Sequence, residues 1–318
     1  MRISLTTCKQ TLPLLQFPAN AIAQLLHRRK DKVVVVMGAT GAGKSRLSVD
    51  LATRFPAEVI NSDKMQVYKG LDIATNKITD EERCGVPHHL LGVVDPESDF
   101  SAANFRSMAS SAVESILHRE QLPIIVGGSN SFIEALVDSD FRSRYDCCFL
   151  WVDVSMATLH SFVSDRVDRM VERGMVSEVR DFYNPEDADY SRGIRRAIGV
   201  PELDYFFRME SSSSSSDDEE TRARILAEAV DRIKMNTSKL ACRQLEKILR
   251  LRNVKGWELH RLDATDVFRK RGGEAAWENI VAGRSAAIVS RFLCDRRRVA
   301  YGGGAPGMEA SLMAAASY

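Results

Sequence analysis

The sequence GATGAGKS, at residues 38–45, indicates the fold, because it matches the pattern G-x-x-x-x-G-K-[ST] of a phosphate-binding loop. The apolar run VVVVM precedes it at residues 33–37, and a helix-like segment follows at residues 44–54. Backbone N–H groups of such a loop and the helix N-terminus attract phosphate oxygens, while the Lys reaches their charge and the Ser hydroxyl suits Mg²⁺. The predicted phosphate-binding loop consists of Gly38, Ala39, Thr40, Gly41, Ala42, Gly43, Lys44 and Ser45.

Apolar runs and helix-like segments alternate through the first half of the chain. The runs rich in Val, Ile or Leu are residues 33–37, 58–60, 90–94, 123–126 and 148–152. This alternation predicts an α/β fold, with a phosphate-loop type of parallel sheet flanked by helices. Helical spacing then dominates, with helices expected over residues 159–170 and 221–252, and it predicts a smaller helical carboxyl-terminal part.

These patterns suggest four regions. Residues 32–154 form the phosphate-loop core, and residues 155–300 form a mainly helical part that completes a substrate channel. Within it, SSSSSSDDEE at residues 211–220 is expected to be a disordered surface loop. Residues 301–318 are expected to be a flexible tail, and residues 1–31 a transit peptide or a flexible arm.

The first thirty residues contain no Asp or Glu but carry Lys, Arg, Ser and Thr. Such a composition is typical of organelle transit peptides and favours a plastid location. The alternatives are a short amphipathic helix at residues 19–27 packed on the domain, and a cytoplasmic or mitochondrial protein.

Composition excludes several classes of protein. With 44 Lys and Arg against 43 Asp and Glu, the net charge of +1 argues against bulk electrostatic coating of nucleic acid. The apolar run at residues 33–37, like the others in the sequence, is far short of the roughly 20 residues of a membrane-spanning helix. The six Cys show neither a disulfide framework nor metal-type spacing, so we interpret them as reduced thiols.

Asp63 follows the second apolar run, at the sheet edge that should also carry the phosphate-binding loop. A carboxylate there could bind Mg²⁺, cap a helix or accept a proton. Thr40 is similarly ambiguous, since a loop Thr could form the turn or direct its hydroxyl at reacting atoms. The residues alone leave these roles open.

Several further blocks resemble the isopentenyltransferases that act on adenine N6. These blocks are NSDKMQVYKGLDIATNK from Asn61, VPHHLLG from Val86, DFSAANFR from Asp99, PIIVGGSNSFIEALV from Pro123 and RRAIGVPE from Arg195. They occur in the family's order, over about residues 33–251. Among the subfamilies, the plant adenylate isopentenyltransferases, which make cytokinins, are the most similar.

The resemblance implies a prenyltransferase with Mg²⁺ as its cofactor and dimethylallyl diphosphate and an adenine nucleotide (AMP, ADP or ATP) as its substrates. The phosphate-binding loop would hold the donor diphosphate. Asp63 would accept the proton of the attacking N6 amine, with Thr40 close to the bridging oxygen and Ser45 as the metal ligand. The family's other substrate-binding positions fall on Ser129, Arg196, Lys239 and Arg243, although the last two could also belong to a solvated helix face.

Two features favour a free nucleotide over tRNA as the acceptor. Relatives that modify tRNA carry a helical insertion after the GG[ST] block, whereas residues 138–146 lead almost directly into the next apolar run here. Those relatives typically read GYRQ where this chain reads GVPE, from Gly199 to Glu202. We therefore expect no tRNA partner, and a tRNA dimethylallyltransferase is the alternative. We also expect no membrane partner; the sequence leaves the oligomeric state open, and it is compatible with a monomer.

A phosphate-loop kinase and a non-catalytic nucleotide-binding regulator are the other rival interpretations. For a kinase, FLWVD at residues 149–153 could be a strand that ends in a metal-binding Asp153. A regulator would need no carboxylate such as Asp63. His88 and His89 are interpreted as residues that pack the pocket, because the sequence offers no second cluster to complete a metal site.

Overall fold

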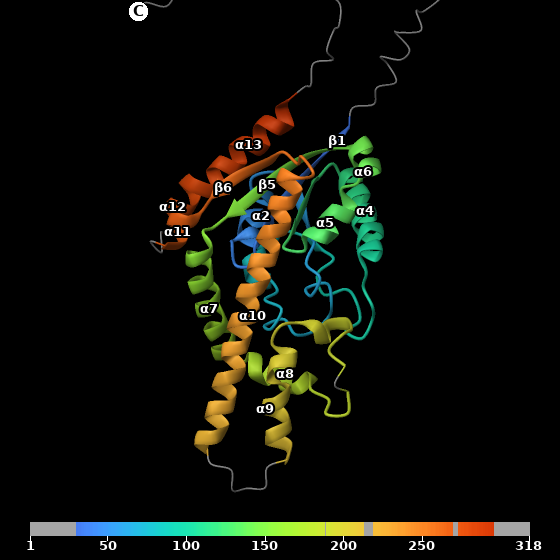
Figure 1. Ribbon diagram of the computed structural model, residues 1–318. Coiled ribbons are helices and arrows are strands. Elements are labelled where there is room, and N and C mark those ends of the chain that lie inside the picture. The colour runs from blue at the N-terminus through green and yellow to red at the C-terminus, as the bar shows by residue number, and fades with distance from the viewer. Residues whose placement is uncertain (1–29, 188, 213–218, 270–272, 296–318) are drawn as a thin grey trace, which may run out of the picture.

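Six parallel strands form the sheet in the part of the chain that the computed structural model describes, residues 30–187, 189–212, 219–269 and 273–295 (Figure 1). The spatial order is β3-β2-β4-β1-β5-β6. The strands are β1 (Asp31–Gly38), β2 (Ala57–Asn61), β3 (His88–His89), β4 (Leu122–Gly127), β5 (Tyr145–Asp153) and β6 (Leu259–Asp263). The predicted parallel α/β sheet is therefore confirmed, whereas residues 1–29 and 296–318, with the expected arm and tail, lie outside the described part.

Strand β1 is buried on both faces, as expected of a central parallel strand. Its side chains alternate: Val35 and Met37 join one apolar core cluster, and Val34 and Val36 join the other. Helices α4 and α5 supply the first cluster, while α2 and α13 supply the second. The helices that cover the first half of the chain are α2 (Lys44–Ala52), α3 (Asp80–Arg83), α4 (Ala102–His118), α5 (Asn130–Leu136) and α6 (Ser139–Arg144).

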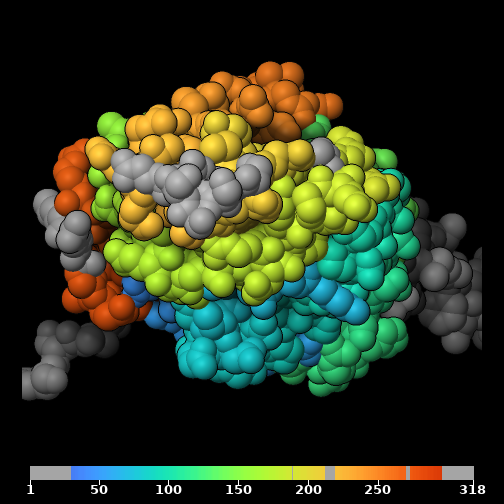
Figure 2. Space-filling view, turned by 90° about the horizontal axis from the view of Figure 1, so that it is seen from below, coloured from blue at the N-terminus to red at the C-terminus, as the bar shows by residue number. Residues whose placement is uncertain are grey.

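The second half is mainly helical but returns to the sheet. Its helical elements are α7 (Met156–Glu172), α8 (Met175–Phe182), η1 (Gly193–Arg196), α9 (Val200–Ser212), α10 (Glu219–Asn253), α11 (Thr265–Arg269), α12 (Glu274–Trp277), η2 (Glu278–Ala282) and α13 (Gly283–Cys294). The long helix α10 lies across the molecule from the sheet to the end that α8 and α9 form (Figure 1). At that end, α8 and α9, lime to yellow in Figure 2, lie beside the blue to cyan segment between β2 and α4.

The strand predicted at residues 90–94 is wrong. The backbone turns sharply there, with φ of 59° at Leu90 and 63° at Gly92, while the strand itself is the two-residue β3. Only Leu90 of this run is buried, and Val93 is 46% exposed, so the apolar residues here belong to a turn and not to a buried strand. Val94 forms only an isolated bridge with Tyr68.

Strand β6 was not predicted, because LHRLD lacks the apolar run of a buried strand. It is an edge strand that pairs with β5, and only Leu262 of its five residues is buried. The region after residue 155 thus contributes one strand to the sheet.

The loop predicted at residues 211–220 is wrong at both ends. Ser211 and Ser212 belong to α9, and Glu219 and Glu220 form the first turn of α10. Acidic side chains in a first turn complement the positive end of the helix dipole, which favours helix over loop there. Residues 213–218 lie outside the described part of the chain.

Candidate active site

A cleft of about 1430 Å³ lies at the carboxyl ends of β1, β2 and β4. Ten of the predicted site residues line it: Thr40, Gly41, Gly43, Lys44, Ser45, Asp63, Ser129, Arg196, Lys239 and Arg243. The other three do not line it. Ala39 and Ala42 are buried in the core, and Gly38 lies against β5, where a Cβ would stand 2.6 Å from the Val152 carbonyl oxygen.

The phosphate-binding loop has the backbone that its sequence predicts. Gly43 has a φ of 90°, and a Cβ on it would lie 2.7 Å from the ring of Trp277, so only glycine fits this turn. Helix α2 begins directly after it at Lys44. The N–H groups of its first turn are therefore available to an anion in the cleft.

Lys44 folds back over the loop, and its Nζ donates to the carbonyl oxygen of Ala39 at 2.8 Å. Burial is the main reason that the pKa of Lys44 is lowered to about 8; the charge of Asp63 opposes this shift, and the charge of Arg166 adds to it. The negative charge of bound phosphate oxygens would stabilise the charged form of Lys44, which burial disfavours.

Thr40 is held by two residues from distant helices. Its main-chain nitrogen donates to Oε1 of Gln244 on α10 at 2.7 Å, and its Oγ1 accepts a hydrogen bond from Nη2 of Arg166 on α7 at 3.0 Å. The hydroxyl therefore does more than form the turn: it faces a guanidinium in the cleft.

Arg166 is a site residue that was missed. Burial lowers its pKa to about 10, helped by Arg169 and opposed by Asp63, and its Nε has no hydrogen-bond partner among the described residues. A signal existed, because Arg166 shares the face of its helix with buried Leu159, Val163 and Met170. A charged side chain within an apolar helix face indicates a function.

Asp63 caps a turn directly after β2. Its Oδ1 accepts from the main-chain nitrogens of Met65 at 2.9 Å and Gln66 at 3.3 Å. Its charge acts on both Lys44 and Arg166, so the carboxylate lies across from the phosphate-binding loop as expected. The cap uses only one of its two oxygens.

Ser129 and Arg196 line the wall beside Asp63. The Oγ of Ser129 accepts from the main-chain nitrogen of Lys64 at 2.9 Å, which links the β4–α5 turn to the Asp63 turn. Arg196 donates from Nε to the Gly193 carbonyl at 3.2 Å and from Nη2 to the Tyr68 hydroxyl at 3.3 Å. Both residues therefore line the cleft wall.

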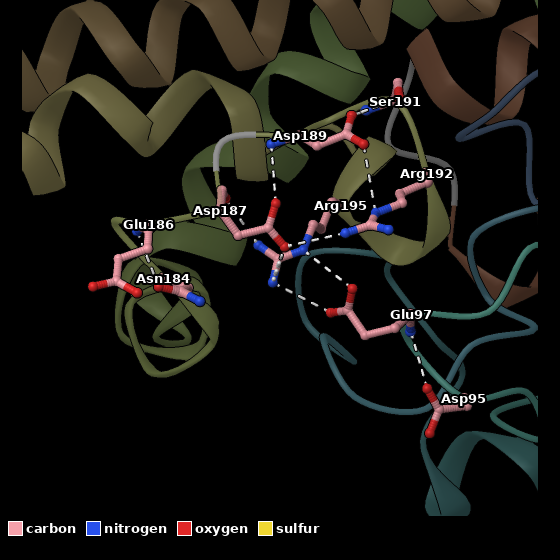
Figure 3. Close-up of polar contacts among 9 residues, drawn as sticks. All are labelled: Asp95, Glu97, Asn184, Glu186, Asp187, Asp189, Ser191, Arg192 and Arg195. Atoms are coloured by element: carbon pink, nitrogen blue, oxygen red, sulfur yellow. Dashed lines mark hydrogen bonds and ion pairs between the residues drawn. The ribbon is translucent and has the colours of Figure 1, made fainter.

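Arg195, the residue before Arg196, supports this wall through two ion pairs. Figure 3 shows Arg195 between Glu97 and Asp187, and its nitrogens lie 3.3 Å from a carboxylate oxygen of each. Only 8% of the Arg195 side chain is exposed. It thus ties η1 to the loop before α4 and fixes where Arg196 projects.

One stripe of α10 forms the opposite wall of the cleft. Lys239 and Arg243 belong to this stripe with residues that were missed: Ile233, Asn236, Thr237, Leu240 and Gln244. Lys64 adds to the basic character across the cleft, where burial lowers its pKa, with smaller contributions from Lys247 and Arg196. The cleft is therefore strongly cationic between the phosphate-binding loop and α10.

Residues that the rival interpretations need lie elsewhere. Asp153 is not a cleft residue, and its Oδ2 accepts from Nε of Arg261 at 2.7 Å. His88 bonds the Val86 carbonyl at 2.8 Å, and His89 bonds Glu58 at 2.6 Å. Neither histidine lines the cleft, so the expectation that they pack the pocket is wrong. Five cysteines in the described residues are free thiols. No helix among those residues is long and apolar enough to cross a membrane.

Comparison with known proteins gives a consistent result. The sequence model of the family "IPP transferase" matches residues 66–142 and 138–248. The chain is 59% identical to adenylate isopentenyltransferase 3, chloroplastic, of Arabidopsis thaliana, over 93% of this chain and 91% of that protein. It is 52% identical to adenylate isopentenyltransferase 7, mitochondrial, of the same plant, over 92% and 90%.

Solved structures with a similar fold include enzymes of tRNA. A eukaryotic dimethylallyltransferase acting on tRNA superimposes with a TM-score of 0.69 at 27% identity, over 83% of this chain and 79% of that one. The tRNA isopentenylpyrophosphate transferase of Bacillus halodurans gives 0.63 at 28% identity, over 83% and 100%.

Proposed function

The chain belongs to the IPP transferase family, acting as an adenylate isopentenyltransferase of cytokinin biosynthesis, and we propose that its cleft joins the two substrates between the phosphate-binding loop and α10. The dimethylallyl group passes from dimethylallyl diphosphate to the N6 amine of AMP, ADP or ATP, with release of pyrophosphate. The observation that supports this most is the juxtaposition of Thr40, Arg166 and Asp63 beside the phosphate-binding loop.

The donor diphosphate lies on the phosphate-binding loop in this proposal. The N–H groups at the start of α2, with Lys44 and Arg166, face the charge that develops on the leaving diphosphate as the allylic C–O bond breaks. Because these donors are held before the substrate arrives, they need little rearrangement in the transition state.

Asp63 is the proposed base for N6. One carboxylate oxygen caps the turn, so the second is free to accept the amine proton as N6 attacks the allylic carbon. Ser129 and Lys64 hold this turn against the β4–α5 turn, which keeps the carboxylate at the cleft. Orientation matters because the adenine amine is a weak nucleophile.

Mg²⁺ is the proposed cofactor. Ser45 is exposed at the start of α2 in the cleft, so a hydroxyl oxygen of the kind that Mg²⁺ accepts as a ligand is present beside the phosphate-binding loop. Bound there, the ion would neutralise diphosphate charge; it usually takes only one or two protein oxygens, with phosphates and water completing its shell.

The acceptor is a free nucleotide rather than tRNA in this proposal, and its phosphates face Lys239 and Arg243. Both side chains are exposed within the cleft and start on α10 between Asn236 and Gln244, and a Lys or Arg side chain is long enough to extend from there to phosphates beyond the ribose. Changing either to Ala should raise KM for ATP more than for AMP. Equal effects on both nucleotides would place these residues on a solvated face.

Plastid location is part of the same proposal. Two relatives at 59% identity are chloroplastic by name, and the acid-free composition of residues 1–30 fits import. A mitochondrial relative at 52% identity gives the alternative, which a fluorescent fusion of the whole chain would distinguish.

The test of the reaction is incubation with Mg²⁺, dimethylallyl diphosphate and AMP, ADP, ATP or unmodified tRNA. The expected products are pyrophosphate and the N6-prenylated nucleotide, identified by mass. Prenylated tRNA as the main product would favour the rival acceptor, and conversion of ATP to ADP would favour a kinase. Asp153→Asn provides a matched control, since only a kinase would need that carboxylate.

A further inference from the structure

Glu202 is a buried acidic residue in the wall of the cleft, and the proposed chemistry gives it no role. It is 8% exposed and lines the cleft near the start of α9. Its Oε2 accepts from the main-chain nitrogen of Gly199 at 2.7 Å, and its Oε1 accepts from Nδ2 of Asn236 at 2.7 Å. Among the described residues, the carboxylate has no Lys, Arg or His within ion-pair distance; Arg232 bonds only its main-chain oxygen.

Capping explains only part of this arrangement. A Glu at the third position of a helix commonly accepts from the N-terminal backbone N–H, and Oε2 does this at Gly199. An exposed side chain would suffice for that role. A carboxylate that is buried without a cation is costly, unless donors satisfy its remaining lone pairs. Each oxygen here has one protein donor and can accept a further hydrogen bond.

The position of Glu202 along α10 shows which part of a nucleotide it can reach. Its partner Asn236 precedes Gln244, which bonds Thr40, by eight residues, or about 12 Å of helix rise. If N6 of the adenine lies at Thr40 and Asp63, the Glu202 carboxylate lies near the opposite end of the nucleoside, which is the ribose. The donors available there are the ribose hydroxyls.

We propose that Glu202, oriented by Asn236, accepts a hydrogen bond from a ribose hydroxyl of the acceptor and thereby selects free nucleotides. This rests on the proposed function. Acidic side chains recognise ribose hydroxyls in the same way in dinucleotide-binding folds. In a polynucleotide the 3′ oxygen carries the next phosphate, whose charge the carboxylate would repel.

The test compares ATP with 2′-deoxy-ATP and 3′-deoxy-ATP as acceptors. The wild-type enzyme should lose about 10- to 150-fold in kcat/KM on the analogue that lacks the contacted hydroxyl, as expected for a hydrogen bond to a charged group. Glu202→Gln keeps an oxygen for Gly199 but has no charge, so its preference for ATP should shrink to about tenfold or less. Equal use of all three nucleotides by the wild type would overturn the proposal.

A second experiment tests the repulsion between the Glu202 carboxylate and a 3′ phosphate. It compares AMP with adenosine 3′,5′-bisphosphate as acceptors, which differ only in that phosphate. The wild type should strongly prefer AMP, and Glu202→Gln should narrow that preference; an unchanged preference would also contradict the proposal.

If the Glu202→Gln variant does not fold, the two comparisons made with the wild-type enzyme still test the proposal. Glu178→Gln is the matched control, since Glu178 bonds the main-chain nitrogens of Ile73 and Ala74 but does not line the cleft. Absence of any product from ATP would instead overturn the proposed function itself.

Discussion

Oε1 of Gln244 on α10 accepts a hydrogen bond from the main-chain nitrogen of Thr40 at 2.7 Å, which joins the α10 wall of the cleft to the phosphate-binding loop. The carbonyl oxygen of Gln244 in turn accepts from Nδ2 of Asn130 at 3.0 Å. Gly128 makes room for the side chain, because a Cβ there would lie 2.5 Å from Nε2 of Gln244. Three segments far apart in the sequence, the phosphate-binding loop, the β4–α5 turn and α10, therefore meet at the main chain of Thr40.

Gln244→Met should lower kcat with little change in KM for the nucleotide. The substitution keeps the volume but leaves the Thr40 N–H without its acceptor, at a cost of about 1–3 kcal/mol. The expected loss is roughly tenfold in kcat, from steady-state assays with both substrates saturating. Gln244→Glu restores the acceptor and the melting temperature, but its charge should raise KM for the donor. A wild-type kcat in the Met variant would show that Thr40 needs no such support.

Arg195→Met should destabilise the protein and weaken acceptor binding. The buried guanidinium bonds Glu97 and Asp187, so its removal should cost about 1–3 kcal/mol in the free energy of unfolding. Arg196 follows it directly, so KM for ATP should rise while donor affinity is preserved. The control is Arg192→Met, whose 52% exposed side chain forms weak ion pairs and should matter by less than about 1 kcal/mol. Equal losses in urea unfolding of both variants would contradict this role of Arg195.

The sequence predicted the parts of the fold that depend on local pattern. The run at residues 33–37 followed by GATGAGKS could only become a buried strand, a tight loop and a helix start, and the structure has these at β1, the phosphate-binding loop and Lys44. The long helix was predicted within two residues of α10, because its apolar spacing is regular. Strand β6 was not predicted, because an edge strand buries too few side chains to produce an apolar run in the sequence.

Local sequence motifs identified the cleft residues at the edge of the sheet. They did not identify Arg166 and Gln244, which line the cleft from helices α7 and α10. Asp63 and Ser129 follow strands, so the sheet edge places them. Arg166 and Gln244 reach Thr40 from helices more than one hundred residues away, and that contact depends on how α7 and α10 pack. Helical spacing gives the face of each helix but not its partner.

Donor affinity should fall as the pH rises through about 8. Burial lowers the pKa of Lys44 in the free enzyme to about 8, so Lys44 is mostly charged below that pH and mostly neutral above it. Only the charged form attracts the diphosphate, so affinity for a non-reacting thiodiphosphate analogue of the donor should be flat below pH 7 and fall about tenfold between pH 7 and 9. Arg166, with a pKa near 10, stays mostly charged over this range.

Calorimetric titrations of the wild type and Lys44→Met across that range provide the measurement. The Met variant should bind more weakly at pH 7 and show no further loss up to pH 9. A parallel decline in both proteins would assign the titration to another group.

Asp63→Asn should abolish most turnover while it preserves the local structure. Asn retains an Oδ1 that accepts from the main-chain nitrogens of Met65 and Gln66, so the turn after β2 should persist. What is lost is the charge and the proton acceptor, and removal of a general base typically costs 10²–10⁴-fold in kcat. Donor affinity should change little, because the phosphate-binding loop and Lys44 remain. If Asp63 instead mainly holds Mg²⁺, donor and metal binding should weaken together and excess Mg²⁺ should restore part of the rate. Measurement of kcat, donor Kd and Mg²⁺ dependence on this variant separates the two roles, and a near wild-type kcat would exclude both.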